Sequence, residues 1–181
     1  DSIGLTGLGE TFMFKKLPEI VDYIRSKNNG IIISVSTNAH LPISVKMAED
    51  LADKIDTIQV SIDGIGKVYE KVRLKSDYSF FYENMLQTIE ACRGKRATVM
   101  FNFVAIKENY HDMADVVELA GKLGVKYVNI TPFNVASVTI HDKTYYDFFQ
   151  TAEFKSELKR AKAMSKNYPE IEFTTWDIEV P

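Results

Sequence analysis

The sequence has one cysteine, Cys92, no long apolar run and no excess of basic side chains. A single thiol excludes an internal disulfide and any zinc or iron–sulfur site built from several thiolates of this chain. No apolar stretch approaches the ~20 residues of a membrane helix. The 22 basic and 25 acidic side chains give a net charge of −3, which argues against a general nucleic-acid binder. We therefore expect a cytoplasmic protein with neither nucleic acid nor a membrane as its partner.

The chain also has few histidines, and they are scattered at His40, His111 and His141. None of them has a second histidine at the i+4 spacing of a zinc-binding helix. Cys92 falls on the apolar side of an expected helix, where a buried structural thiol is the usual occupant. We therefore expect no metal site made from the side chains of this chain.

What the sequence does contain is a regular alternation of strands and amphipathic helices. Hydrophobic residues make up 45% of the chain and charged residues 26%, as in an ordinary folded protein with one sizeable core. After a strand that ends near residue 6, the pattern predicts further strands near 31–36, 57–63, 98–106, 126–131 and 171–175. Helices are expected between them, near 17–24, 47–55, 79–93, 113–123 and 154–161. Such succession predicts parallel strands joined by right-handed crossovers.

The faces of the strands indicate which parallel fold is present. In residues 57–63, Gln59, Ser61 and Asp63 alternate with apolar residues, so one face of this strand is polar. An open doubly wound sheet would have two apolar faces, whereas a barrel-like sheet can keep a polar interior. Six strands are too few for a closed barrel of ~250 residues. We therefore predict an α/β fold: a partial, incomplete (β/α) TIM-like barrel with parallel strands and outer helices.

The candidate site residues stand where the strands end, because ligands of parallel α/β folds gather at the carboxyl ends of the strands. Each candidate also has a purely structural interpretation, as a turn, a cap or a surface side chain. The spacing of Gly7 and Gly9 lacks the third glycine of a dinucleotide-binding turn, since Phe12 stands there. The candidates are Gly7, Gly9 and Glu10 after the first strand, Thr37 and Asn38 after the second, Ser61 and Asp63 after the third, and Arg73 in the following loop.

The order of these segments resembles the radical S-adenosylmethionine (SAM) enzyme superfamily. Residues 7–11 are similar to its Gly-Gly-Glu-Pro motif, 37–39 to its Thr-Asn-Gly/Ala motif and 60–64 to its Val-Ser-Ile/Leu-Asp-Gly motif. A strand with Asn102 followed by an Asn-centred turn at 107–109, and Leu-Gly-Val at 123–125, complete the resemblance. Leu8 interrupts the paired glycines, and Thr11 replaces the usual proline.

The resemblance implies a function and a set of cofactor contacts. A radical SAM iron–sulfur oxidoreductase binds a [4Fe–4S] cluster, cleaves SAM reductively and abstracts hydrogen through a 5′-deoxyadenosyl radical, with flavodoxin or ferredoxin as reductant. On this resemblance the backbone at Gly7 and Gly9 and the Glu10 side chain meet the SAM amino group. Ser61 and Asp63 meet the ribose, and Arg73 is a weaker candidate for the carboxylate. Thr37, Asn38 and Asn102 are counted as further cofactor-binding residues, and no catalytic residue or substrate is identified.

The cluster-binding Cys-x-x-x-Cys-x-x-Cys loop of the family is absent from the sequence. We therefore expect one truncated core domain over 1–181, with family-like units to residue 133 and a divergent tail over 134–181. Such a fragment would be inactive by itself, with its cluster ligands ahead of Asp1. Two alternatives remain at this point: a nucleoside-binding domain without a cluster, and an unrelated α/β-barrel enzyme that uses Glu10 and Asp63 as acid and base.

Overall fold

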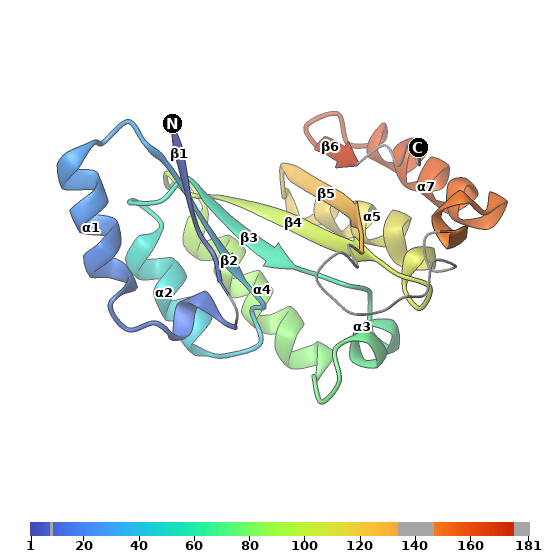
Figure 1. Cartoon of the computed structure of the whole chain (residues 1–181), viewed down its shortest axis with the longest axis horizontal. Coiled ribbons are helices and arrows are strands. Elements are labelled where there is room, and N and C mark those ends of the chain that lie inside the picture. Colours follow the sequence, from blue (N-terminus) through green and yellow to red (C-terminus); the bar gives the residue numbers. More distant parts are fainter. Residues whose placement is uncertain (8, 134–146, 176–181) are drawn as a thin grey trace. The chain divides into compact units, whose positions relative to one another are not determined.

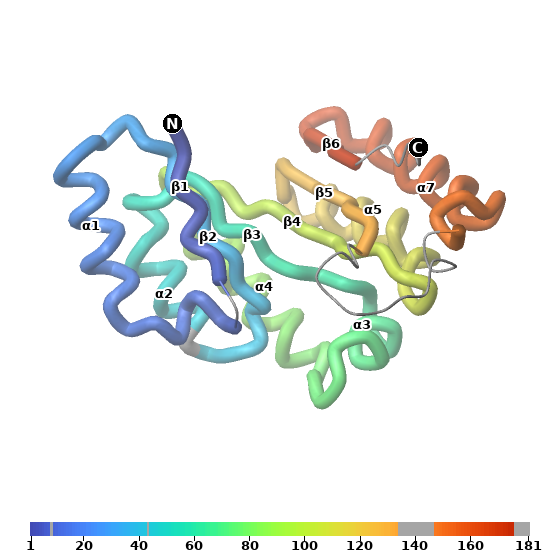
Figure 2. The backbone as a smooth tube through the Cα atoms, viewed as in Figure 1, coloured from blue at the N-terminus to red at the C-terminus, as the bar shows by residue number. Residues whose placement is uncertain are grey.

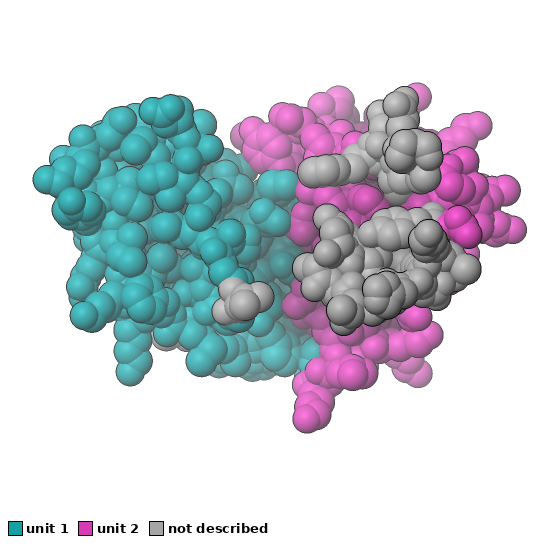
Figure 3. Space-filling view, in the orientation of Figure 1, with its two compact units in different colours: residues 1–61, 76–101 teal, residues 62–75, 102–181 magenta. Residues whose placement is uncertain are grey.

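The structure is a computed structural model of the chain, and it describes residues 1–7, 9–133 and 147–175. The chain divides into two compact units (Figure 3). Unit 1 comprises residues 1–61 and 76–101, and unit 2 comprises residues 62–75 and 102–181. Six strands follow one another in chain order across one sheet, from β1 to β6.

Unit 1 is built on three parallel strands: β1 (Ser2–Leu5), β2 (Ile32–Thr37) and β3 (Thr57–Ser61). Gly4 pairs with Ser34, and Ser36 pairs with Gln59, so that β2 lies between its neighbours (Figure 2). The connecting helices are η1 (Thr11–Met13), α1 (Leu17–Lys27), α2 (Ile43–Leu51) and α4 (Tyr78–Cys92) (Figure 1). Strand β4 (Thr98–Ala105) begins in unit 1 and ends in unit 2.

The helices of unit 1 form because their apolar residues fall on one side and their ends are satisfied locally. In α1, Leu17 and Val21 are buried four residues apart, and proline stands in the first turn, where its missing N–H costs no hydrogen bond. Helix α4 begins at an Asp77 side chain that accepts a hydrogen bond from the Phe80 amide. Helices α2 and α4 pack against each other. Their buried faces cover the apolar face of the strands.

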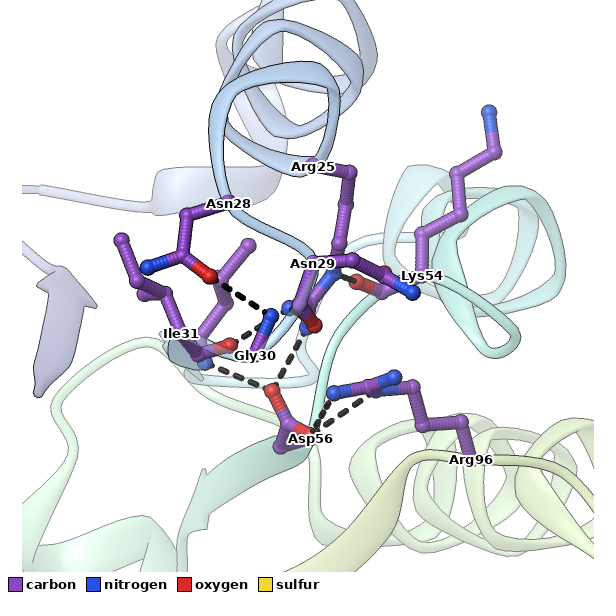
Figure 4. A network of polar contacts seen from close by, with 9 residues as sticks. Arg25, Asn28, Asn29, Gly30, Ile31, Lys54, Asp56 and Arg96 are labelled. Atoms are coloured by element: carbon purple, nitrogen blue, oxygen red, sulfur yellow. Dashed lines mark hydrogen bonds and ion pairs between the residues drawn. The ribbon is translucent and has the colours of Figure 1, made fainter.

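A charged network holds the amino ends of the strands in unit 1 (Figure 4). Asp56, which directly precedes β3, accepts hydrogen bonds from the Ile33 amide at 2.7 Å and from Arg25 at 2.6 Å. Arg96, ahead of β4, donates to the other oxygen of Asp56 at 2.8 Å. Arg25 also donates to the carbonyl oxygens of Asn29, Ile31 and Lys54. One carboxylate and two guanidinium groups thus join the start of three strands to the end of α1.

Unit 2 contains the end of β4 and the parallel pair β5 (Tyr127–Pro132) and β6 (Glu172–Thr175). The helices of this unit are α3 (Lys67–Val72), η2 (Tyr110–Asp112), α5 (Met113–Leu123), η3 (Phe148–Gln150) and α7 (Ala152–Ser165). Gly124 caps the end of α5, and its φ of +71° is the left-handed conformation that favours glycine. Helices α5 and α7 pack against each other.

The structure confirms the predicted α/β fold with its strands in chain order and one polar face. In β3, Ile58 and Val60 are buried while Gln59 and Ser61 are half-buried. Some boundaries differ from the prediction: β3 ends at Ser61, two residues before Asp63, and α2 covers Ile43–Leu51 where a helix near 47–55 was expected. Helix α3 was not expected. Six residues after the positive-φ Gly66 are too short to show a helical period. Within the described residues, no helix is both long and apolar enough to cross a membrane.

Candidate functional site

The turn after β1 is joined to the turn after β2 by the Glu10 carboxylate. Its Oε1 accepts a hydrogen bond from the Phe12 amide at 3.1 Å, and its Oε2 accepts one from the Asn38 amide at 2.7 Å. Two of the predicted site segments therefore meet at one side chain. No ion pair involves Glu10 in the part of the chain that the structure describes. Its negative charge is available to a cationic group of a ligand.

The glycines of this turn leave open space beside Glu10. A Cβ atom built on Gly7 or on Gly9 would have no atom within 4 Å, and Gly9 has a φ of +106°. Both glycines line a groove of about 330 Å³ beside β1, together with Glu10 and the apolar side chains of Phe14 and Leu17. A ligand can therefore approach the backbone here. Leu8, which interrupts the two glycines, lies outside the described residues.

The turn after β2, residues 37–40, is held by its own side chains. Thr37 is buried, and its Oγ1 accepts a hydrogen bond from the Ala39 amide at 3.0 Å. Asn38 Oδ1 accepts one from the His40 amide at 2.9 Å. Ala39 has a φ of +51°, which a residue other than glycine adopts only when its surroundings impose it. The structural interpretation of Thr37 and Asn38 as turn-forming residues therefore holds, while Asn38 also contacts Glu10.

In unit 2, Asp63 and Arg73 form an ion pair. Asp63 Oδ2 accepts from Arg73 Nε at 2.9 Å and lies 2.7 Å from Nη2, and its Oδ1 accepts from the Val104 amide at 3.1 Å. Both side chains are largely buried, 11% exposed for Asp63 and 27% for Arg73. The Arg73 guanidinium also lies over the Tyr69 ring, 5.8 Å from its centroid. The positive charge of Arg73 is thus already matched by a carboxylate.

The turn that carries Asp63 is fixed by two further side chains that the sequence interpretation did not single out as site residues. Asn109, fully buried, donates to the carbonyl oxygens of Asp63 at 3.2 Å and Val104 at 2.9 Å. Asp112 accepts a hydrogen bond from the Ile65 amide at 2.8 Å, and burial raises the pKa of this carboxyl. In the sequence, only the Asn-centred turn at 107–109, after the strand that carries Asn102, pointed to Asn109 and Asp112.

Asn102 belongs to a row of polar side chains on the polar face of unit 2. Asn129 Nδ2 donates to Asn102 Oδ1 at 2.8 Å, and Thr174 Oγ1 donates to Asn129 Oδ1 at 3.0 Å. The alternation of Asn129 with Val128 and Ile130 predicted its face, but nothing in the sequence predicted that β6 would place Thr174 beside it. Ser61 is half-buried at the end of β3 in unit 1, and no hydrogen bond of its hydroxyl appears among the described residues.

The described residues do not fit an iron–sulfur cluster. They contain no group of three histidine, cysteine or acidic side chains arranged to hold a metal ion. Cys92 is buried in α4, and burial raises the pKa of its thiol to about 11, so the thiolate that a cluster requires is disfavoured. An amino-acid-like cation is a different case, because the Glu10 carboxylate and the open space at Gly7 and Gly9 fit an ammonium group.

A model of the radical SAM superfamily matches residues 3–120 of the sequence. The chain belongs to the radical SAM superfamily. The match covers the segments that carry Glu10, Asn38, Ser61, Asp63 and Asn102. Among curated proteins, none matches the sequence.

Several solved structures have the same fold as this chain. SuiB of Streptococcus suis, which has also been solved with S-adenosylmethionine and with the precursor peptide SuiA, is 16% identical with a TM-score of 0.71. The similarity covers 98% of this chain and 40% of SuiB. A radical SAM methyltransferase from Sphaerobacter thermophilus is 16% identical with a TM-score of 0.64, over 97% of this chain and 50% of the other.

A shorter solved domain matches this chain over nearly the whole length of both. A domain of pyruvate-formate lyase-activating enzyme from Bacteroides vulgatus ATCC 8482 is 12% identical with a TM-score of 0.59, over 97% of this chain and 98% of that domain. At these identities the similarity establishes the fold and leaves the reaction to other evidence. The chain spans less than half the length of SuiB.

Proposed function

We propose that this chain is the SAM-binding part of a radical SAM enzyme whose cluster ligands are supplied from outside these 181 residues. Together, SAM and a reduced [4Fe–4S] cluster provide chemistry that abstracts a hydrogen atom from a substrate. The observation that carries the proposal is the Glu10 carboxylate, which accepts two backbone hydrogen bonds and has no cationic partner among the described residues. Units 1 and 2 form one core domain in this proposal.

The roles of the residues follow from their surroundings. Glu10 binds the SAM ammonium group, and Gly7 and Gly9 let the ligand approach the backbone, since a side chain at either would occupy open space. Ser61, whose hydroxyl is uncommitted among the described residues, binds the ribose. Asp63 contributes to the ribose contact with the lone pairs that Arg73 and the Val104 amide leave unused.

The remaining candidates have supporting roles in this proposal. Thr37 and Asn38 hold the turn that faces Glu10, because both side chains bond backbone amides within it. Asn102 lines the polar face through its bond to Asn129. Arg73 orients the Asp63 side chain through their ion pair. A low-potential cluster needs an electron donor such as flavodoxin or ferredoxin in a reducing compartment, which favours the cytoplasm.

Reductive cleavage tests the proposal directly. The full-length protein that contains this chain is reconstituted anaerobically with iron and sulfide, reduced with dithionite and incubated with SAM. We expect 5′-deoxyadenosine to accumulate, measured by liquid chromatography. A protein that carries an intact cluster and yet forms none would refute the enzyme proposal. A protein that takes up no cluster and still binds SAM would instead be the nucleoside-binding domain without a cluster.

A matched pair of variants tests the role of Glu10. Glu10→Gln keeps one of the two oxygens that accept backbone hydrogen bonds and removes the charge, so we expect SAM affinity to fall about tenfold. Glu19→Gln removes an exposed carboxylate of α1 from the same unit and should leave the affinity unchanged. Isothermal titration of SAM measures both. Equal affinity of the two variants would contradict the ammonium contact.

A further inference from the structure

Helix α7 of unit 2 carries a row of four lysines on one face. Lys155, Lys159, Lys162 and Lys166 stand four, three and four positions apart, the spacing of neighbours on a helix surface, and all four are exposed. Lys155, Lys159 and Lys166 form no ion pair with any residue that the structure describes. Over residues 152–166, five basic and two acidic side chains give a charge of +3, although the whole chain has a net charge of −3.

One end of this row borders a groove of about 570 Å³ between α7 and β6 (Figure 1). The groove is lined by Lys162, Ser165 and Lys166 of α7 and by Ile171, Phe173, Thr174 and Thr175 in and just before β6. Phe173 is only half-buried, whereas Val128, its partner in β5, is fully buried. The groove therefore leaves apolar surface of the outermost strand uncovered, beside two cations.

Strand β6 also has an open edge. It is the last strand of the described sheet, in which β5 is its neighbour. The Glu172 amide donates to the Lys126 carbonyl oxygen at 2.7 Å, so the backbone groups of Glu172 point toward β5. Because this direction alternates along a strand, the N–H and C=O groups of Phe173 point to the open edge. Such an edge can pair with one more strand.

The lysines and the edge together favour an extended acidic peptide as the ligand. A peptide that adds a strand gains main-chain hydrogen bonds, and every second side chain faces the groove. The lysine row is about 16 Å long at 1.5 Å per residue, which is about the length of five residues in a strand. Glu172 does not line the groove, since its side chain lies on the other face of β6 from Phe173.

We propose that the edge of β6 binds an extended acidic peptide segment of a partner protein, which continues the sheet as one further strand beside α7. Its acidic side chains pair with Lys162 and Lys166, and an apolar side chain between them covers Phe173. A nucleic acid would satisfy the lysines but not the backbone groups of the edge. This contact involves neither Glu10 nor its turn, so it goes beyond the proposed SAM site and does not depend on it.

A short peptide tests the lysine contacts. The probe is fluorescein-labelled Glu-Thr-Val-Thr-Glu with blocked ends, whose glutamates and valine share one face of a strand, and its binding to the full-length protein is measured by fluorescence anisotropy. We expect affinity to fall about tenfold in a Lys162→Gln, Lys166→Gln double variant. Lys15→Gln, Lys16→Gln removes the same charge from exposed positions of unit 1 and should leave the affinity unchanged. Both variants should unfold at the same urea concentration as the unmodified protein.

Altered peptides separate the charge from the strand pairing. Gln-Thr-Val-Thr-Gln should bind about tenfold more weakly, since it lacks both carboxylates. Two further probes carry an N-methyl group on the valine or on the threonine after it. One of these adjacent amides faces β6 in any strand pairing, so one of the two probes should lose at least about tenfold in affinity. On binding of the unmodified probe, amide hydrogen exchange of residues 171–175 should slow.

Several outcomes would overturn the proposal. Equal binding of both methylated probes would show attraction to the lysines without strand pairing, and equal binding of the glutamine peptide would remove the match of charge. Tighter binding of a single-stranded oligothymidylate, lost in the Lys162→Gln, Lys166→Gln variant, would assign the lysines to a nucleic acid instead. A full-length protein that binds SAM but none of the peptides would refute this inference and leave the proposed function standing.

Discussion

The two ends of the strands in unit 1 each carry a carboxylate that accepts backbone hydrogen bonds, but the two carboxylates differ in their counter-charges. At the amino ends, Asp56 is matched by Arg25 and Arg96. At the carboxyl ends, Glu10 bonds the Phe12 and Asn38 amides and has no ion pair among the described residues. A carboxylate with two cations nearby stabilises the fold, whereas one whose charge is unmatched can bind a cationic ligand. The comparison separates a structural end of the strands from a functional one.

Removing the charge of Asp56 should have the largest effect on stability. Asp56→Asn leaves Arg25, only 11% exposed, without its counter-ion, so we expect the free energy of unfolding to fall by about 3 kcal/mol. Urea unfolding at pH 7 measures the change. The matched control is Asp53→Asn, which breaks an exposed pair with Lys95 and should cost about 0.5 kcal/mol or less. Equal costs for the two variants would remove the distinction between the ends of the strands.

The pH dependence of stability should show the same distinction. Burial tends to raise the pKa of Asp56, but the hydrogen bonds from the Ile33 amide, Arg25 and Arg96 outweigh it and place the pKa below the ordinary value of 3.8. The unfolded chain therefore takes up a proton before the folded one, and stability is lost as the pH falls below about 4. Asp56→Asn should flatten this part of the curve.

Gly7, which follows β1, and Gly64, which follows β3, should respond differently to an added methyl group. A Cβ on Gly64, whose φ is +142°, would lie 2.8 Å from Val68 Cγ1 and 3.0 Å from the Tyr69 amide nitrogen. Gly64→Ala should therefore lower the free energy of unfolding by about 2 kcal/mol. Gly7→Ala meets open space, so it should change stability by no more than about 0.5 kcal/mol and weaken SAM binding instead. A stable Gly64→Ala variant would show that the turn relaxes freely.

Glu10→Gln should have a smaller effect on stability than Asp56→Asn. Glutamine keeps one of the two acceptor oxygens, so one amide hydrogen bond is retained and the other amide faces the side-chain NH2 group. No cation among the described residues loses its partner, so we expect the free energy of unfolding to fall by about 1 to 2 kcal/mol, measured by urea unfolding. A loss near 3 kcal/mol would place Glu10 with Asp56 as a structural carboxylate.

Asp112→Asn should change stability least. The pKa of Asp112 is raised chiefly by burial, so the folded state holds its proton more tightly than the unfolded one. The stability it contributes falls as the pH rises from about 4 to the raised pKa, the opposite sign to Asp56. Asparagine still accepts the hydrogen bond from the Ile65 amide, so at pH 7 we expect a change within about 0.5 kcal/mol, neutral or stabilising. A large loss would show that the charge itself holds the turn.

Several features of the fold and site were predictable because they depend on local patterns. The alternation of Ile58 and Val60 with Gln59 and Ser61 predicted a strand with one polar face, and the structure has it. Glu10 and Asn38 were both expected where strands end, and the structure adds that β1 and β2 are paired and that the Asn38 amide donates to Glu10. The helix expected near 79–93 is present as α4, which begins behind the Asp77 cap.

Other contacts lie beyond any local pattern. Arg73 was a weaker candidate for a ligand carboxylate, since such an arginine is more often a surface residue, and the structure pairs it with Asp63 at 2.7 Å. Asn109 reaches back 46 residues to the Asp63 carbonyl, and Asp56 collects Arg25 and Arg96 from 31 and 40 residues away. These hydrogen-bond and ion-pair partners depend on where the connections between the strands place each turn in space.

The sequence by itself determined the strand and helix succession, the polar face, the family resemblance and the lack of several thiolates for a cluster. These depend on residue type and on spacing within a few positions. Only the tertiary structure decided which carboxylate is matched by cations and which is not, that Arg73 is already paired, and that α7 places lysines beside the open edge of β6. Each depends on groups from separate segments meeting at one place, and that meeting is set by strand register and helix packing.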